Sequence, residues 1–310
     1  MTLQQSSSMR LVQVILNRDS GGASDPDELL AHALTVHRAA GWEARGVAVP
    51  GEQIGRALEE IAGDGPERIV VAGGDGTIRA AARAAMACDA ALGVVALGTM
   101  NLLAKDLGLP LDPFEAVNAL PTAREARIDV GEVNGLIFLH SSLIGVFPQI
   151  GVERERARRE GGVAGYAGAA ANAARVVWRA PAVRVELQID GRAQRLRTFA
   201  IVVSNNRMRG DPSAPYRRVR MDAGSLGLYV SKHAGRAGLF RLLMSIGLGR
   251  WRFDQDIHEH EALEVTIHSW RPLQVSNDGE IERMRSPLRY RLLPGALRAL
   301  VPAAAEPTAP

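Results

Sequence analysis

Hydrophobic positions follow two different rhythms along this chain of 310 residues. Up to about residue 130, apolar runs typical of strands alternate with runs at helical spacing. Such a βαβα order predicts a parallel sheet, in which ligands bind at the carboxyl ends of the strands. The predicted strands are 11–16, 47–49, 69–72 and 93–96, and the predicted helices are 29–40, 54–61 and the run that follows Thr77.

Beyond about residue 131, apolar and polar residues alternate in short segments separated by Gly, Asn, Asp and Pro. The segments 183–189, 226–230 and 265–275 show this alternation, which is typical of an antiparallel sheet or sandwich. We therefore expect an α/β domain over residues 1–130, a β-rich antiparallel sandwich over residues 131–300 and a flexible tail over residues 301–310. The active site is expected in the cleft between the two domains.

A glycine-rich turn, Gly73-Gly74-Asp75-Gly76-Thr77, joins the third predicted strand to the helix that follows it. Glycines let a phosphate approach the backbone, and the first N–H groups of a helix attract anions. The spacing matches neither the P-loop, which needs Gly-Lys-Ser/Thr, nor the dinucleotide-binding fingerprint. The turn therefore predicts an anion site, and an ordinary strand-to-helix turn is the alternative.

The composition excludes several classes of protein. An apolar fraction of 46% is ordinary for a globular chain, and a formal net charge of +3 gives no reason to expect a nucleic-acid partner. The single cysteine, Cys88, excludes an intramolecular disulfide and a cysteine-cluster metal site. Since the chain has neither a signal-peptide pattern nor an apolar stretch of about eighteen residues, we expect it in the cytoplasm.

Three further segments carry similar chemistry. Asn17-Arg-Asp-Ser-Gly-Gly22 follows the first predicted strand, and residues 97–108, which include Gly-Thr-Met-Asn, follow the fourth. Residues 275–280, with the sequence Val-Ser-Asn-Asp-Gly-Glu, lie far downstream. In this order, and with the glycine turn, these segments resemble the diacylglycerol kinase catalytic-domain family. That family includes bacterial lipid kinases and sphingosine kinases and is related in fold to the NAD kinases.

The resemblance spans residues 10 to about 300, and it implies an enzyme of lipid metabolism. Such an enzyme transfers the γ-phosphate of ATP, with Mg²⁺, to the hydroxyl of a lipid alcohol, either diacylglycerol or a sphingoid-type lipid, as in phospholipid biosynthesis. One departure is Arg18, where the family usually has a proline after the asparagine.

Three carboxylates are the catalytic residues that the resemblance implies. Asp75 would hold the metal directly or through water, because a hard cation prefers carboxylate ligands. Glu280 would accept the proton of the lipid hydroxyl as a general base, and Asp278 would orient Glu280 or assist the metal. Local chemistry offers alternatives, since an Asp in a glycine turn can bond its own backbone and Asn-Asp-Gly is a strong hairpin sequence.

The nucleotide-binding residues implied by the resemblance follow the first, third and fourth predicted strands. Two of them, Thr77 and Asn101, are also residue types that cap helices, which is the alternative for both. The predicted set is Asn17, Ser20, Gly21, Gly73, Gly74, Gly76, Thr77, Thr99 and Asn101.

Another departure from the family concerns a second metal site. Its members often carry an Asp-Asp-Gly segment in the β-rich domain, but this chain has Ala223 in place of the second carboxylate. Asp222 is therefore the one candidate ligand that remains there.

A basic and apolar stretch lies at residues 232–253, within a segment without acidic residues between Asp222 and Asp254. Basic residues mixed with aromatic and aliphatic ones suit an interfacial helix, so we expect peripheral contact with an anionic membrane surface at the inner face of the membrane. The alternative is an amphipathic element packed on the β domain.

Two other functions stay open. A soluble kinase, for example of the NAD type, would use the same fold, although the basic stretch at 232–253 counts against it. A catalytically inactive nucleotide- or lipid-binding regulator is favoured only by Ala223, and the presence of Asp75 and Glu280 counts against it.

Overall fold

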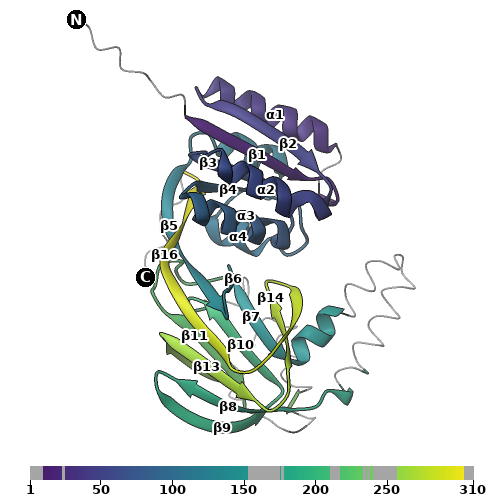
Figure 1. Cartoon of the computed structure of the whole chain (residues 1–310), viewed down its shortest axis with the longest axis vertical. Helices are drawn as coiled ribbons and strands as arrows, with labels where there is room; N and C mark the ends of the chain where they lie inside the picture. Colours follow the sequence, from purple (N-terminus) through teal and green to yellow (C-terminus); the bar gives the residue numbers. More distant parts are fainter. Residues whose placement is uncertain are drawn as a thin grey trace, which may run out of the picture. The chain divides into compact units, whose positions relative to one another are not determined.

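The computed structural model describes residues 10–22, 25–152, 175, 178–209, 217–232, 235, 238–239 and 257–303 (Figure 1). The chain forms two compact units, which meet in the sequence at residues 128/129 and 294/295. Unit 1 contains the chain up to Ile128 and returns from Gly295 onwards, and unit 2 contains residues 129–294.

Unit 1 is built on a parallel sheet with the strand order β2-β1-β3-β4. Every residue of β3 and β4 is buried, as expected for strands with both faces covered. The βαβα prediction is confirmed. The strands are β1 (Leu11–Asn17), β2 (Glu43–Val49), β3 (Arg68–Gly73) and β4 (Ala91–Ala96). The helices are α1 (Pro26–Ala39), η1 (Gly51–Gln53), α2 (Ile54–Gly63), α3 (Asp75–Cys88), α4 (Leu102–Leu107) and α5 (Pro113–Ala119).

Several elements of unit 1, β2 and α3 among them, begin earlier than the apolar pattern predicts. Strand β2 starts at Glu43, because its first residues pair with β1 through the backbone and need no apolar side chains. Helix α3 starts at Asp75, because Gly74 is extended and serves as its N-cap. In α2 the helical spacing is confirmed, since Ile54, Leu58 and Ile61 are its buried residues.

Unit 2 is a β-sandwich, which confirms the second prediction. One sheet has six strands in the order β12-β11-β10-β7-β14-β15, and the other contains β16-β13-β8-β9 with β5 and β6. A single apolar core lies between them and includes Ile144 and Ile201 from the first sheet and Leu187 and Tyr290 from the second. The strands are β5 (Arg124–Val133), β6 (Leu136–Phe138), β7 (Ser141–Gly145), β8 (Val183–Ile189), β9 (Arg192–Thr198), β10 (Ala200–Asn205), β11 (Leu226–Ser231), β12 (Ile257–Ala262), β13 (Glu264–Ser269), β14 (Leu273–Asn277), β15 (Glu280–Met284) and β16 (Leu288–Val301).

Strand β16 belongs to both units. Its first residues pair antiparallel with β13, whereas Ala299 pairs in parallel with Leu92 of β4. The predicted second domain runs to residue 300, but residues 295–300 group with unit 1, because this strand continues without a break into the first sheet. Of the predicted tail, Val301 ends β16, and residues 304–310 lie outside the described residues.

A buried histidine packs beside an aromatic and cationic stack in unit 1. The ring of Trp42 lies 4.3 Å from the guanidinium carbons of both Arg10 and Arg68. His37, fully buried near Arg68, places Nδ1 2.8 Å from the carbonyl of Ala33, so Nδ1 carries the proton. Burial lowers the pKa of His37, and the charge of Arg68 lowers it further.

This environment predicts a loss of stability in acid. Since the pKa of His37 in the folded chain lies below the unfolded value of 6.5, the unfolded state binds more protons as the pH falls through that value. The contribution of neutral His37 is therefore complete above pH 6.5 and declines below it. Urea unfolding at neutral pH and at about pH 5 should show a smaller loss of stability for His37→Gln than for the native chain. His32→Gln, on the same helix, is the control, and an unchanged pH dependence in His37→Gln would contradict this account.

Candidate active site

Three loops of unit 1 meet at the carboxyl edge of its sheet, because strands β1, β3 and β4 are neighbours in it. The side-chain amide of Asn17, the last residue of β1, donates a hydrogen bond of 2.9 Å to the hydroxyl of Thr77 in α3. This bond holds the end of β1 beside the glycine turn.

The loop after β1 is held by its own polar groups. The side-chain oxygen of Asn17 accepts from the backbone N–H of Asp19 at 3.0 Å, and the carboxylate of Asp19 accepts from the N–H of Gly51 at 2.7 Å. A Cβ on Gly22 would lie 2.8 Å from the backbone of Leu97, whereas one on Gly21 would meet nothing within 4 Å. The loop therefore runs directly against the end of β4, with Gly21 and the half-buried Ser20 at its outer side.

Two glycines of the turn after β3, Gly73 and Gly74, differ in whether the packing leaves room for a Cβ atom. A Cβ on Gly73 would lie 2.6 Å from the Cβ of Thr77, so the packing of the turn itself demands glycine there. A Cβ on Gly74 would find its nearest atom at 3.8 Å, an ordinary contact with the backbone of Gly98. The packing of the fold therefore does not require glycine at position 74.

The start of α3 suits an anion. Gly74 is its N-cap, and no side chain caps the helix. Thr77 is the third helical residue rather than the cap, so the alternative interpretation of Thr77 as a helix cap is wrong. The N-terminal N–H groups of this helix, which has 14 residues, lie at the glycine turn.

Asp75 ties the turn to the next loop. Its two carboxylate oxygens accept the backbone N–H groups of Asn101, at 3.2 Å, and Leu102, at 3.1 Å, at the start of α4. Each oxygen retains acceptor capacity beyond one such bond, because an ionised carboxylate offers about four lone-pair sites.

Asn101 has a left-handed backbone conformation, with a φ of 51°. It occupies the N-cap position of α4, but its side chain makes no capping hydrogen bond. Its side-chain oxygen is buried and has no hydrogen-bond partner among the described residues. A buried polar atom without a partner is uncommon in folded proteins. Thr99, in the same loop, is exposed.

In unit 2 the residues from Asn277 to Glu280 form the turn of the β14–β15 hairpin. Asn277 pairs with Glu280, and Asp278 and Gly279 have φ values of 50° and 96°, as a type I′ turn requires. The local interpretation as a hairpin is therefore confirmed. Glu280 is exposed at the first position of β15.

Asp278 anchors this hairpin. Its carboxylate accepts three backbone N–H groups, from Leu139 at 2.6 Å, His140 at 2.9 Å and Ser141 at 3.0 Å. The described contacts of Asp278 therefore fix the hairpin to the loop between β6 and β7, and none of them reaches Glu280.

Sequence reasoning missed the residues that hold the other side of that loop. The carbonyl of Leu139 accepts from the side-chain amide of Asn205 at 3.0 Å and from the guanidinium of Arg218 at 2.7 Å. Asn205 and Arg218 are almost fully buried, and so is Asp129, whose carboxylate accepts the N–H of Gly224 at 2.8 Å. The available signal was the polar run Ser-Asn-Asn at residues 204–206, which begins in the last two residues of the otherwise apolar strand β10.

Asp222, the remaining candidate for a second metal site, is paired with a neighbour. Its carboxylate accepts two hydrogen bonds from Arg220, at 2.9 and 3.1 Å, and this interaction lowers the pKa of Asp222. Across the described part of the chain, no three Asp, Glu, His or Cys side chains lie close enough to hold a metal ion.

The predicted membrane stretch, residues 232–253, lies outside the described residues except at positions 232, 235, 238 and 239. Among the described helices, none is long and apolar enough to cross a membrane.

Comparisons with known proteins agree with this architecture. A family model described as the diacylglycerol kinase catalytic domain matches residues 11–133. A second, described as the YegS C-terminal NAD kinase beta sandwich-like domain, matches residues 144–301.

Several relatives match most of the chain. A probable lipid kinase YegS-like protein of Pseudomonas fluorescens is 29% identical over 283 residues, which cover 89% of this chain and 91% of that protein. A diacylglycerol kinase of Staphylococcus saprophyticus is 23% identical over 248 residues, covering 78% of this chain and 79% of the relative. A solved structure of a putative diacylglycerol kinase from Bacillus anthracis shares the fold, with a TM-score of 0.76 and 23% identity over 96% of this chain and 99% of its own.

The fold and the loop cluster define a kinase architecture in which an α/β catalytic domain precedes a β-sandwich. The chain belongs to the diacylglycerol kinase catalytic-domain family, with the YegS type of C-terminal domain, which confirms the resemblance seen in the sequence. It is therefore a phosphotransferase of a lipid kinase family.

The two glycines of the turn give a test of this geometry. Gly73→Ala should destabilise the chain by about 1–3 kcal/mol, because its Cβ would collide with Thr77 in a packed turn. Gly74→Ala should destabilise the chain much less, since its Cβ would make only an ordinary contact of 3.8 Å with the backbone of Gly98. Urea unfolding of both variants measures the difference, and equal destabilisation by the two substitutions would contradict the described turn.

Proposed function

We propose that this family member is an ATP- and Mg²⁺-dependent kinase that transfers the γ-phosphate to the hydroxyl of a lipid alcohol, of the diacylglycerol or sphingoid type. The observation that carries the proposal is the loop cluster itself. It combines a buried Asn101 oxygen without a partner among the described residues with a glycine at position 74 that the packing does not need. The lipid acceptor follows from the names of the relatives.

In this proposal the ATP phosphates lie against the turn between β3 and α3. Gly74 and Gly76 leave the backbone accessible, and the first N–H groups of α3 with the positive end of the helix dipole attract the phosphates. Asn17 fixes the hydroxyl of Thr77 at this turn, while Ser20, Gly21 and Thr99 belong to the two flanking loops. Asn101 would offer its amide oxygen to a donor group of the nucleotide or to the metal.

The residues present fit a magnesium ion that is held mostly by the substrate. Mg²⁺ usually binds through one or two carboxylates together with phosphate oxygens and water, and Asp75 supplies such a carboxylate. When bound, the ion would neutralise negative charge that develops on the phosphate groups during transfer. Asp222 lies outside this proposal, because its carboxylate is paired with Arg220.

Glu280 is proposed as the general base. The lipid hydroxyl gives its proton to the carboxylate of Glu280 while its oxygen forms a bond to the γ-phosphorus, and the bond from that phosphorus to the departing ADP oxygen breaks. Asp278 contributes by fixing the hairpin that carries Glu280, through its three backbone hydrogen bonds.

The lipid has to be taken from a membrane surface, so the proposal includes a peripheral contact at the inner face of the membrane. The basic and apolar stretch at 232–253 remains the predicted contact on sequence grounds.

The substrate is identified by offering labelled ATP and Mg²⁺ with a panel of lipids in mixed micelles. The panel contains diacylglycerol, monoacylglycerol, a sphingoid base and phosphatidylglycerol, and NAD serves as the soluble control. A phosphorylated lipid supports the proposal and names the acceptor. Labelled NAD phosphate would identify a soluble kinase instead, and ATP binding without any product would identify an inactive regulator.

Glu280→Gln tests the assignment of the base. The variant should lower kcat by about 10²–10⁴-fold, the range for loss of a general base, while its affinity for ATP stays the same. Glu282→Gln, two residues along the same strand, is the control and should keep its activity. Native turnover by the Glu280 variant would remove this residue from the proposed mechanism.

A further inference from the structure

One face of the β-sandwich carries more arginines than acids can pair. In the sheet β16-β13-β8-β9, buried residues such as Val185, Leu187 and Tyr290 alternate with residues that point outward. We call the outward set the arginine face. It consists of Arg184, Glu186 and Gln188 on β8, Arg195 and Arg197 on β9, Glu264, Thr266 and His268 on β13, and Arg289 and Arg291 on β16.

Some of these arginines are paired. Arg195 lies opposite Glu186 and bonds it at 2.9 Å, and Arg291 makes two hydrogen bonds of 2.8 and 3.0 Å to Glu132 of β5. Glu186 and Glu132 are therefore already paired with arginines. The remaining nearby carboxylate, Glu264, lies opposite Arg291 on the neighbouring strand.

Arg184 and Arg197 are arranged differently. They stand directly opposite one another on β8 and β9, both are exposed, and neither forms an ion pair within the described part of the chain. Like charges at directly opposed positions destabilise a sheet. An anionic surface laid against this face would remove that repulsion.

An exposed tryptophan, Trp270, lies beside Arg184 in the strand register. Ser269 pairs with Val185, so Trp270, the next residue, comes level with Arg184. Its side chain is 74% exposed. Arg285 lies near this end of the sheet, because the hydroxyl of its neighbour Ser286 accepts a hydrogen bond of 2.9 Å from the backbone N–H of Ser269. A second tryptophan, Trp178, is 65% exposed shortly before β8 begins at this end of the strand.

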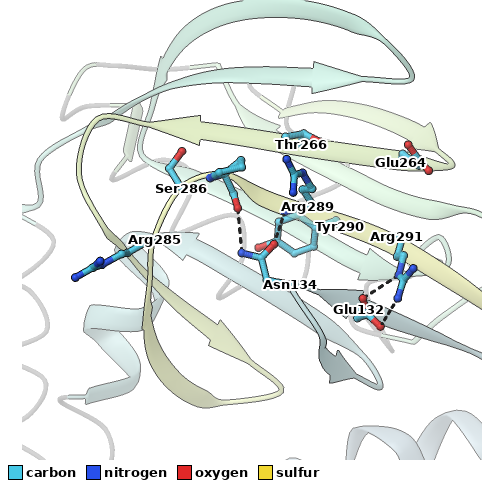
Figure 2. Close-up of a pocket in the computed structure, with 10 residues that line it drawn as sticks. Glu132, Asn134, Glu264, Thr266, Arg285, Ser286, Arg289, Tyr290 and Arg291 are labelled. Atoms are coloured by element: carbon cyan, nitrogen blue, oxygen red, sulfur yellow. Dashed lines mark hydrogen bonds and ion pairs between the residues drawn. The ribbon is translucent and has the colours of Figure 1, made fainter.

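A hollow of about 520 Å³ opens between the arginine face and the strand end of β5 (Figure 2). Its acids gather around Arg291, whereas Arg289 lies beside Thr266 at the other side. Asn134 fixes this part of β16, because its side-chain oxygen accepts the N–H of Arg289 at 2.8 Å and its amide donates to the carbonyl of Pro287 at 3.0 Å. The guanidinium of Arg289 and the hydroxyls of Thr266 and Ser286 are donors that suit a phosphate group.

We propose that the arginine face, with Trp270 at its end, is a docking surface for an anionic membrane, and that the hollow receives the phosphate of a lipid headgroup. Exposed tryptophan rings reside at the headgroup level of a bilayer, and each arginine near an anionic surface adds attraction. This inference rests on the proposed lipid kinase activity in one respect, because an enzyme with a lipid acceptor has to contact a membrane. None of the residues of the arginine face belongs to the stretch at 232–253.

Binding of the full chain to vesicles, without ATP, tests this surface. Vesicles of phosphatidylcholine alone are compared with vesicles that also contain phosphatidylglycerol, at low and at high salt. Arg184→Glu with Arg197→Glu should weaken binding to the anionic vesicles about tenfold or more, and Trp270→Ala should weaken it further in either background. The control, Arg45→Glu with Arg56→Glu in unit 1, makes the same charge change and should bind like the native chain.

Two results would overturn the proposal. One is native binding by the Arg184 and Arg197 double variant, and the other is tighter binding of the native chain to a single-stranded oligonucleotide than to anionic vesicles. A melting temperature for Arg197→Glu at or above the native value supports the argument, because the new carboxylate would pair with Arg184, and a lower value counts against it. Since no ATP is present, these outcomes do not depend on whether the lipid panel yields a product.

Discussion

The candidate site depends on how closely three backbone segments approach one another at the carboxyl edge of the parallel sheet. Gly22 runs against Leu97, Gly98 against Gly74, and Gly73 against the side chain of Thr77, at separations that leave no room for a Cβ at positions 22 and 73. The Asn17–Thr77 hydrogen bond and the two bonds accepted by Asp75 lock the loops in this arrangement. Because the protein itself holds these loops, the N-terminal N–H groups of α3 have a fixed arrangement, and in the proposed function this arrangement would reduce the entropic cost of binding a phosphate.

Unit 2 reaches a comparable rigidity by another route. Instead of glycine contacts it uses buried polar side chains around the loop between β6 and β7, which Asp278 holds from one side and Asn205 and Arg218 from the other. Buried polar groups of this kind fix a geometry through the partners they find, and here Asp278, Asn205 and one guanidinium nitrogen of Arg218 pair with backbone groups. The β14–β15 hairpin, and with it the proposed base Glu280, is therefore positioned by the core of the sandwich rather than by its own turn alone.

The sequence predicted the elements of unit 1 well, because β3 and β4 are continuous apolar runs and α2 has clear helical spacing. It also predicted a parallel sheet with a ligand edge at the carboxyl ends of its strands, where the loops after β1, β3 and β4 lie. It missed the anchoring role of Asp278, whose partners lie more than a hundred residues away in the chain, and the burial of Arg218, which local pattern does not reveal. The return of β16 to the first sheet was missed for the same reason, because one apolar strand gives no sign that it serves two units.

The central claim is that the glycine edge of unit 1 holds the phosphates of ATP. The most direct measurement is calorimetric titration of Mg²⁺ and ATP into the native chain and into Gly74→Ala, a substitution that the packing accommodates. The account predicts about tenfold weaker ATP binding by the variant, which corresponds to roughly 1.4 kcal/mol, with unfolding unchanged. Equal affinity of the two proteins for ATP would contradict it, and the nucleotide would then have to bind elsewhere.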